Sequence, residues 1–474
     1  MKKLIFTFIL LSLISLSFSQ TTNYAWAQGS STISSGYGKS TTTDNSGNII
    51  VVGDFSGPSI SFSTTTLSNN GLGDIFMIKY SPSGNVIWVK GIGGSDFDYV
   101  KSVSTDPSGN ILITGYFNSP TITFGSFTLT NSDNTGTSRD IFIAKFDPMG
   151  NVLWAKSAGG PLSDYGYSVD ADAMGTTVVG AFLSNTISFG SQTLTCSGAF
   201  DAFIVRFDPS GNVLWALSAG GASQESALGV VTDVNGSSII TGSFRSSLIT
   251  FGSTTLNNTT NLGNADCFVT KIDPFGNVLW AKNTNGTAFE EGKSVFIDSN
   301  GNVFVLGDYD GANMSIGTTT ITSSGGYDFF IAKYDALGNH IWLKAHGGTA
   351  NDYGQSITTD TNGNAVFAGY FQSPNILIGS TTHTNTGNSD LFAIKYDSTG
   401  SVIWSQTWGG TLNDIGYGIS SDATGNIMLT GSFESPTINF GLEISDNVTP
   451  SLRSKLTPFL RSKLTPLFEL YILC

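Results

Sequence analysis

The stretch Asp140-Ile-Phe-Ile-Ala-Lys-Phe-Asp-Pro-Met-Gly-Asn-Val-Leu-Trp154 decides the fold, because close copies of it run through the chain. A second pattern, Ser102-Val-Ser-Thr-Asp-Pro-Ser-Gly-Asn-Ile-Leu-Ile-Thr-Gly115, alternates with the first. The Trp of the first pattern recurs at steps of 61 to 66 residues, as Trp26, Trp88, Trp154, Trp215, Trp280, Trp342 and Trp404. The turn Asp of the second recurs as Asp44, Asp106, Asp172, Asp233, Asp298, Asp360 and Asp422. A repeat of this length indicates stacked structural units.

Each pattern predicts a β-hairpin. Apolar and β-branched runs flank a D-x-x-G-N turn, in which the Asp side chain accepts amide hydrogen bonds and the Gly adopts φ > 0. Two hairpins give each unit four strands, which we name A, B, C and D in chain order. One such unit cannot bury both of its faces, so the copies are expected to stack as the blades of a β-propeller. The repeated Trp is then expected to pack between blades, and the Lys of each D-x-F-x-x-K strand to partner a turn or an edge.

The strand count predicts a closed ring of seven blades, an all-β fold. Strands A and B occur seven times, whereas C and D occur together six times. The unpaired D-type segment, residues 23–28, is expected to form the outer strand of the last blade and so remove an open sheet edge. No D-x-F-x-x-K strand follows Gly441, so the seventh blade is expected to be incomplete at the C-terminal side.

Composition excludes several classes of protein. Of 474 residues, only 12% are charged and 57 are Gly, and the net charge is −14. These values exclude a coiled coil, a highly charged disordered chain and a polytopic membrane protein. The negative charge argues against a nucleic-acid partner.

The two ends of the chain differ from the repeats. Residues 1–19 have a basic start, an apolar run and small residues before Gln20, which predicts a signal peptide. The propeller is expected over residues 20–441, with no membrane span in the mature chain. Residues 442–474 contain Leu-Arg-Ser-Lys-Leu-Thr-Pro twice and gain basic residues, so we interpret them as an aberrant or disordered tail.

The two repeated patterns resemble the SBBP (seven-bladed β-propeller) repeats of secreted bacterial proteins. The resemblance covers about residues 23–441 and keeps its register through six or seven copies. It implies a propeller fold in a secreted or cell-surface protein.

A repeated acid opens each strand A except the first, where Gly36 stands. The six acids are Asp98, Asp164, Glu225, Glu290, Asp352 and Asp414. Because strand A is innermost in a propeller, these carboxylates are expected to ring one mouth of the central channel. Two interpretations stay open: each acid caps backbone amides of its own D–A loop, or the ring binds a polar ligand or a cation such as calcium.

Departures from the repeat are further candidates for a binding site. His346 and Trp408 stand in the predicted D–A loops, where other copies carry Ile92, Ala158, Ala219 and Thr284. An exposed Trp408 would stack on a sugar ring, and loop packing is the alternative. The long B–C connections, rich in Ser, Thr, Asn and Gly, open on the same face.

Enzyme signatures are missing from the sequence. The three His residues are scattered, so they predict neither a metal cluster nor a Ser/His/Asp set. No phosphate-binding loop or cofactor motif is present. We therefore expect a non-enzymatic binding or scaffold module, without a cofactor, whose partner is a surface protein or a polysaccharide. Two alternatives stay open: a glycan-degrading enzyme that uses the channel acids as general acid and base, and a structural spacer without a ligand.

Overall fold

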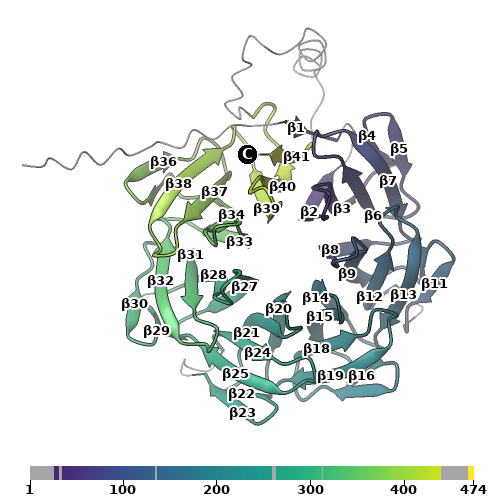
Figure 1. Cartoon of the computed structure of the whole chain (residues 1–474), viewed down its shortest axis with the longest axis horizontal. Coiled ribbons are helices and arrows are strands. Elements are labelled where there is room, and N and C mark those ends of the chain that lie inside the picture. Colours follow the sequence, from purple (N-terminus) through teal and green to yellow (C-terminus); the bar gives the residue numbers. More distant parts are fainter. Residues whose placement is uncertain are drawn as a thin grey trace, which may run out of the picture.

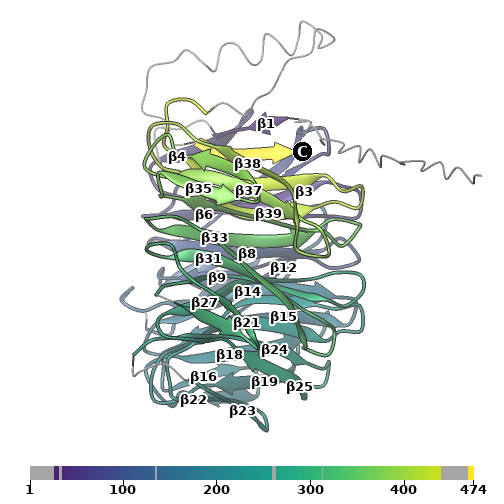
Figure 2. The same ribbon diagram turned by 90° about the vertical axis from the view of Figure 1, so that its left-hand side faces the viewer.

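Seven four-stranded antiparallel sheets stand around a central axis in the computed structural model (Figure 1). The structure describes residues 26–30, 35–133, 136–258, 263–311, 313–438 and 468–473. The predicted signal peptide and most of the tail lie outside these residues. Each sheet is ordered A-B-C-D from the axis to the rim, as the repeat predicts. Figure 2 turns the ring edge-on, with the strands running across its thickness.

The inner half of each blade is the A–B hairpin. The A strands are β2 (Gly36–Thr43), β8 (Asp98–Thr105), β14 (Asp164–Asp172), β20 (Glu225–Thr232), β27 (Glu290–Ile297), β33 (Asp352–Thr359) and β39 (Asp414–Ser421). The B strands are β3 (Ile49–Phe55), β9 (Ile111–Phe117), β15 (Gly175–Phe182), β21 (Ser238–Phe244), β28 (Val303–Tyr309), β34 (Ala365–Phe371) and β40 (Ile427–Phe433). Almost every B-strand residue is buried, because neighbouring blades cover both faces of the sheet.

The outer half is the C–D hairpin. The C strands are β6 (Asp74–Tyr80), β12 (Asp140–Phe146), β18 (Asp201–Phe207), β24 (Asp266–Ile272), β31 (Asp328–Tyr334) and β37 (Asp390–Tyr396). The D strands are β7 (Val86–Ile92), β13 (Val152–Ala158), β19 (Val213–Ala219), β25 (Val278–Asn283), β32 (His340–His346) and β38 (Val402–Trp408). Among the described residues, no helix is long and apolar enough to cross a membrane.

The seventh blade combines both ends of the chain. Its outer strand is β1 (Ala27–Gln28), so the predicted closure by the N-terminal strand is confirmed. The expectation of an incomplete blade is wrong, because β41 (Phe468–Leu473) pairs with β40 on one side and with β1 on the other. The tail sequence lacks the C-strand pattern, but backbone pairing alone is enough to place a strand here.

The B–C connections, although rich in Ser and Thr, contain regular secondary structure. In six blades they carry a short hairpin, namely β4 (Ser59–Phe62) with β5 (Thr65–Ser68), β10 (Thr121–Phe124) with β11 (Phe127–Thr130), β16 (Thr186–Phe189) with β17 (Gln192–Thr195), β22 (Leu248–Phe251) with β23 (Thr254–Asn257), β29 (Met314–Ile316) with β30 (Thr319–Ile321) and β35 (Asn375–Ile378) with β36 (Thr381–Thr384). A two-residue strand, β26 (Asn285–Gly286), extends the hairpin of β29. In β10, Ile122 and Phe124 are fully buried while Thr121 and Thr123 face solvent. The threonines therefore occupy the exposed face of a half-buried strand.

The repeated Trp joins neighbouring blades, as predicted. Six of the seven indoles donate to a carbonyl in the C–D turn of the next blade; Trp154 Nε1, for example, lies 3.2 Å from the Pro209 oxygen. The same bond is made by Trp26, Trp88, Trp215, Trp280 and Trp342. The glycine of that turn rests on the indole ring with positive φ. These contacts repeat blade by blade and set the spacing of the ring.

The repeated basic residue of strand C partners the turn Asp of its own blade. Lys145 Nζ lies 2.9 Å from Asp106 Oδ2, and both side chains are more than nine-tenths buried. Ion pairs of this kind occur in five blades. The predicted turn role of these cations is thereby confirmed.

Two turns of identical sequence show that glycine is needed for two reasons, its positive φ and its close contact with an indole ring. The sequence Asp-Pro-Ser-Gly-Asn contains both Gly109, with φ 79°, and Gly211, with φ 85°. An added Cβ would lie 2.9 Å from Trp154 Cδ2 at Gly211 but no closer than 3.6 Å to any atom at Gly109. Gly109→Ala is expected to cost about 1 kcal/mol of backbone strain, and Gly211→Ala about 1–3 kcal/mol more from overpacking. Urea unfolding of both variants measures the difference, and equal losses would contradict a structural role for the indole contact.

Candidate functional site at the axial face

The six repeated acids lie beneath the loops, not at an open channel mouth. All six are the first residue of a strand A and have no exposed surface. Asp98 Oδ2 accepts hydrogen bonds from the Gly94 amide at 2.7 Å and from Ser119 Oγ at 2.9 Å. Asp164, Asp352 and Asp414 make the same pair of contacts with their own loops. These acids therefore do not ring an open mouth. For Asp98, Asp164, Asp352 and Asp414 the structure agrees with the other interpretation, that each caps amides of its own loops.

Each of these acids lies close to the Asp that opens a C strand of the preceding blade. Burial, with a smaller contribution from the neighbouring charge of Asp74, raises the pKa of Asp98 to about 7. Burial also raises the pKa of Asp74, to about 6. The pairs therefore hold protons at a pH where exposed carboxyls are ionised. Among the described residues, no group of three or more His, Cys, Asp or Glu side chains is placed to hold a metal ion. A ligand-binding role for the six acids stays a prediction.

Trp408 and His346 end strands β38 and β32 and do not lie in loops. Trp408 is 5% exposed and packs in a core cluster with Val366, Leu391 and Ile419. Its indole has almost no exposed face on which a sugar ring can stack, so of the two interpretations packing describes Trp408 in this structure. The last residue of strand D turns inward, toward the core.

His346 is held by two hydrogen bonds. Its Nδ1 lies 2.9 Å from the Leu377 carbonyl oxygen, and its Nε2 contacts the Tyr396 hydroxyl. Burial lowers the pKa of His346. The ring therefore serves as a neutral packing group in this structure, and its binding role stays a prediction.

One position of strand A, repeated in all seven blades, was not identified as a candidate from the sequence. The register of every A–B pair shifts at the fourth residue of strand A, which leaves one residue without a partner in strand B. Such a β-bulge re-aims the side chain of the extra residue. Strand A is innermost (Figure 1), so these bulged, partly exposed residues lie on the strands nearest the axis; they are Lys39, Lys101, Tyr167, Leu228, Lys293, Gln355 and Tyr417.

Five side chains between the second and third blades form what we call the Tyr–Arg cluster: Tyr99, Tyr116, Arg139, Tyr165 and Tyr167. The ring centroids of Tyr99 and Tyr116 are 5.2 Å apart, and those of Tyr116 and Tyr165 are 4.9 Å apart, edge to face. Tyr165 and Tyr167 stack at 5.8 Å. Each of these separations is within the range of favourable aromatic pairing.

Arg139 is fixed between two rings of the cluster. Its Cζ lies 5.4 Å from the centroids of both Tyr116 and Tyr165. Its Nη1 donates to the Tyr165 hydroxyl at 2.9 Å, and its Nε donates to Asn118 Oδ1 at 3.2 Å. These contacts order the guanidinium before any partner arrives, and cation–π attraction adds to them. Burial raises the pKa of Tyr116 to about 12, so its hydroxyl stays protonated.

Lysines and carboxylates occupy other parts of the axis. Lys293 pairs with Asp308 and lies 4.8 Å from the Tyr353 ring centroid. Lys39 lies 4.5 Å and 4.4 Å from the centroids of Tyr37 and Tyr417. Burial raises the pKa of Asp54 to about 6, although the charges of Lys39 and Lys101 lower it. The axial wall is therefore aromatic with mixed charge.

One sequence signal points to the axial residues. The positions of Tyr99 and Lys101 vary freely between copies, as Tyr, Ser, Glu or Ile and as Lys, Tyr, Leu or Gln, inside an otherwise repeated strand. The sequence analysis looked for departures from the repeat in the connections and therefore missed them. Only the bulge shows which strand positions turn toward the axis.

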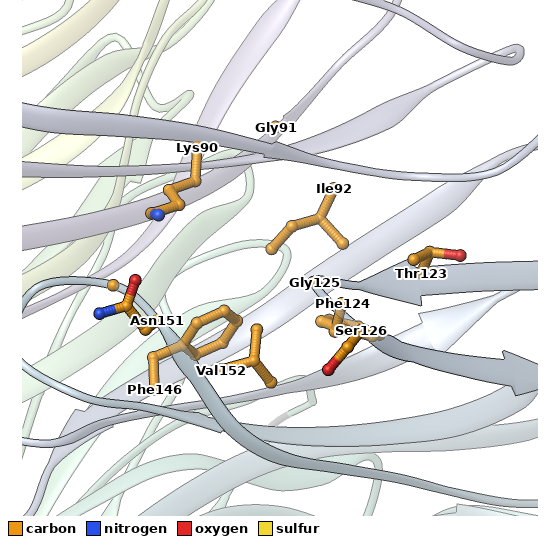
Figure 3. Close-up of a pocket in the computed structure, with 11 residues that line it drawn as sticks. Lys90, Gly91, Ile92, Thr123, Phe124, Gly125, Ser126, Phe146, Asn151 and Val152 are labelled. Carbon is orange, nitrogen blue, oxygen red and sulfur yellow. The ribbon is translucent and has the colours of Figure 1, made fainter.

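A separate pocket lies at the rim, between the first and second blades (Figure 3). It has a volume of about 310 Å³ and is lined by Lys90 and Ile92 from β7, by the turn of the β10–β11 hairpin, and by Phe146 and Val152. Gly91 contributes no side chain there, whereas the other blades carry Ser, Asn, Ala or Thr at this position. The lining combines apolar side chains with the polar groups of Lys90, Thr123, Ser126 and Asn151.

No protein-family model matches the chain. Two curated proteins are similar to it in sequence. An uncharacterized WD repeat-containing protein of Acanthamoeba polyphaga mimivirus is 26% identical over 323 residues, which is 55% of this chain and 23% of that protein. The regulatory protein FlaEY of Caulobacter vibrioides is 26% identical over 177 residues, 36% of this chain and 18% of that protein. The chain thus spans less than a quarter of the length of these relatives.

Solved structures with a similar arrangement have little sequence in common with the chain. The Pan2 WD40 domain of Neurospora crassa is 10% identical with a TM-score of 0.35, over 70% of this chain and 85% of that one. A protein of unknown function from Dyadobacter fermentans is 10% identical with a TM-score of 0.38, over 93% and 94%. The seven sheets around one axis establish that this chain is a β-propeller repeat protein.

Proposed function

We propose that the chain is an exported propeller of the SBBP type that binds a protein partner through the Tyr–Arg cluster. The carrying observation is Arg139, which is held between Tyr116 and Tyr165 and remains partly exposed on the axial face. Tyr and Arg are the residue types enriched at the energetic centres of protein interfaces. An ordered side chain loses little entropy on binding, which favours affinity.

A protein partner fits this site better than a polysaccharide. Tyr116 is 9% exposed, and its ring lies edge to face with Tyr165 while Arg139 lies over both rings. The arrangement leaves small exposed areas of several side chains and no broad free ring face for a sugar. The WD repeat in the name of one relative is consistent with an interaction module. The six acids proposed as alternative catalytic groups have no exposed surface, so a glycan-degrading role has less support.

Export is part of the same proposal. Residues 1–19 have the pattern of a signal peptide, and the resemblance to SBBP repeats implies a secreted or cell-surface protein. Mass spectrometry of the protein released by its producing cells is expected to find Gln20 at the N-terminus. Retention of residues 1–19 in the folded protein would contradict export.

Photocrosslinking identifies the partner and tests the site. A photoreactive amino acid at Tyr167 is expected to capture one extracellular protein, whose affinity is then measured by calorimetry with the purified propeller. Arg139→Ala and Tyr165→Ala are each expected to raise the Kd at least tenfold, as for a hot-spot residue. Arg245→Ala is the matched control, because Arg245 lies over the single ring of Phe289 on the same face, at 5.4 Å, and its Kd is expected to change less than threefold.

Two results would contradict the proposed function. Equal losses of affinity in the Arg139 and Arg245 variants would place the binding energy elsewhere on the face. Saturable binding to a glycan array that the Arg139 substitution abolishes would make the partner a polysaccharide.

A further inference from the structure

The third strand carries the side chains that lock six of the seven blades together. In β12 the three anchors are Asp140, Phe142 and Lys145. The Phe142 ring covers Gly115 of β9, where an added Cβ would lie 2.9 Å from Phe142 Cε1. Lys145 forms the buried ion pair with Asp106. In the pattern Asp-x-Phe-x-x-Lys, the Phe thus packs on a glycine of strand B and the Lys pairs with an Asp of the A–B turn. We call this glycine and this Asp the receptor groups.

The seventh blade keeps both receptor groups. Gly431 stands in β40 where Gly115 stands in β9, and the described atoms nearest to its added Cβ belong to Ile415 and Gly416. Asp422 forms its turn through hydrogen bonds from Thr424 and Asn426. Among the described residues, no lysine or arginine forms an ion pair with Asp422. Both receptor groups are therefore in place, and within residues 26–438, apart from the undescribed gaps, no aromatic ring or cation is recorded on them.

The strand at this position, β41, does not have the Asp-x-Phe-x-x-Lys sequence. In β12, Asp140, Phe142 and Lys145 pair with Phe117, Gly115 and Leu112 of β9. In β41 the corresponding residues are Phe468, Leu470 and Leu473, which pair with Phe433, Gly431 and Met428. β41 therefore contributes backbone pairing in the right register but carries Phe, Leu and Leu where the other blades carry Asp, Phe and Lys.

The outer side of β41 pairs with β1. Among the described residues this pairing covers Ala27 and Gln28, whereas β13 pairs with β12 through six residues. The first strand A opens with Gly36, so an incoming Asp meets none of the acids that face it at the other blade junctions. An incoming Lys can also donate a hydrogen bond to the Pro82 carbonyl, which already accepts one from Trp26. In the same way, Lys79 and Trp88 both donate to the Pro148 carbonyl.

We propose that the third-strand position of the seventh blade is a strand-exchange site. It accepts an extended Asp-x-Phe-x-x-Lys segment of a partner polypeptide, which displaces β41 and pairs with β40 (Figure 1). Main-chain hydrogen bonds supply the general affinity, and the Phe on Gly431 with the Lys on Asp422 supply the specificity, as in other complexes formed by strand addition. This site is distinct from the Tyr–Arg cluster and does not depend on it.

A peptide with the sequence of residues 390–396, Asp-Leu-Phe-Ala-Ile-Lys-Tyr, tests the proposal on the full-length chain. Fluorescence anisotropy is expected to show saturable binding. The same peptide with Phe392→Ser and Lys395→Ser retains the backbone pairing and is expected to bind at least tenfold more weakly. Equal binding of the two peptides, or binding of neither, would overturn the proposal.

Variants of the chain locate the binding position. Asp422→Asn keeps the turn acceptor but removes its charge, so it is expected to weaken peptide binding at least tenfold. Asp147→Asn is the matched control, since Asp147 makes the same turn and, among the described residues, forms no ion pair, and it is expected to leave binding unchanged. Tyr471→Pro removes a main-chain donor from β41 and is expected to increase peptide affinity by weakening its competitor. An unchanged affinity in the Asp422 variant, or in the Tyr471 variant, would show that the peptide does not exchange with β41.

Discussion

Asp106→Ala is expected to destabilise the protein by about 3–5 kcal/mol, the cost of removing one partner of a buried ion pair. The substitution leaves the ammonium of Lys145 4% exposed and without its carboxylate. It also removes the acceptor of the Ser108 and Asn110 amides, which form the turn. Urea denaturation at neutral pH measures the loss.

The chain contains a closely matched control for this prediction. Asp147 accepts the Met149 and Asn151 amides with the same geometry, but it lies in an exposed C–D turn and has no cation paired with it. Asp147→Ala is expected to cost about 1 kcal/mol, as for the net loss of turn hydrogen bonds. Equal costs at the two positions would show that the turn, and not the buried lysine, explains the recurrence of Asp.

Stability is expected to fall as the pH rises from about 5 to 7 through the buried carboxyl pairs. Burial raises the pKa of Asp98 to about 7 and that of Asp164 to about 6, so the native state holds protons that the unfolded chain has lost. Since the native state then binds more protons, stability decreases with rising pH by up to about 1.4 kcal/mol per unit for each such group. The Asp residues of the A–B turns have the opposite effect below pH 4, where stability rises with pH. Hydrogen bonds and Lys145 keep the pKa of Asp106 below its usual value despite burial.

Asp98→Asn isolates the contribution of one pair. The amide accepts the loop hydrogen bonds without a charge, so the variant is expected to gain roughly 2 kcal/mol relative to the wild type between pH 5 and 7. Histidines with lowered pKa values, such as His346, oppose the trend in both proteins and cancel in this difference. Asp147→Asn is expected to show no such pH-dependent gain, because the pKa of Asp147 is lowered. A difference between wild type and Asp98→Asn that stays flat from pH 5 to 8 would contradict a raised pKa at Asp98.

The candidate site was only partly accessible to sequence reasoning. The repeat correctly located the acids at the start of strand A, but it did not show that loops such as the one containing Ser119 cover them. It marked Trp408 as unusual without showing that the last residue of strand D turns into the core. The Tyr–Arg cluster consists of residues from three separate strands and a loop. Their spacing in the sequence does not predict that they lie close together.

The sequence by itself determined the local structure and its repetition. Turn chemistry acts over five residues, so each D-x-x-G-N motif specifies its hairpin wherever it occurs, and seven copies with a spare N-terminal strand specify the closed ring. Only the tertiary structure decided which polar side chains are buried, which bulged residues line the axis, and which strand fills the seventh blade. Burial and bulge direction depend on what neighbouring blades place nearby, and strand pairing through the backbone accepts a segment such as β41 that carries none of the repeated side chains.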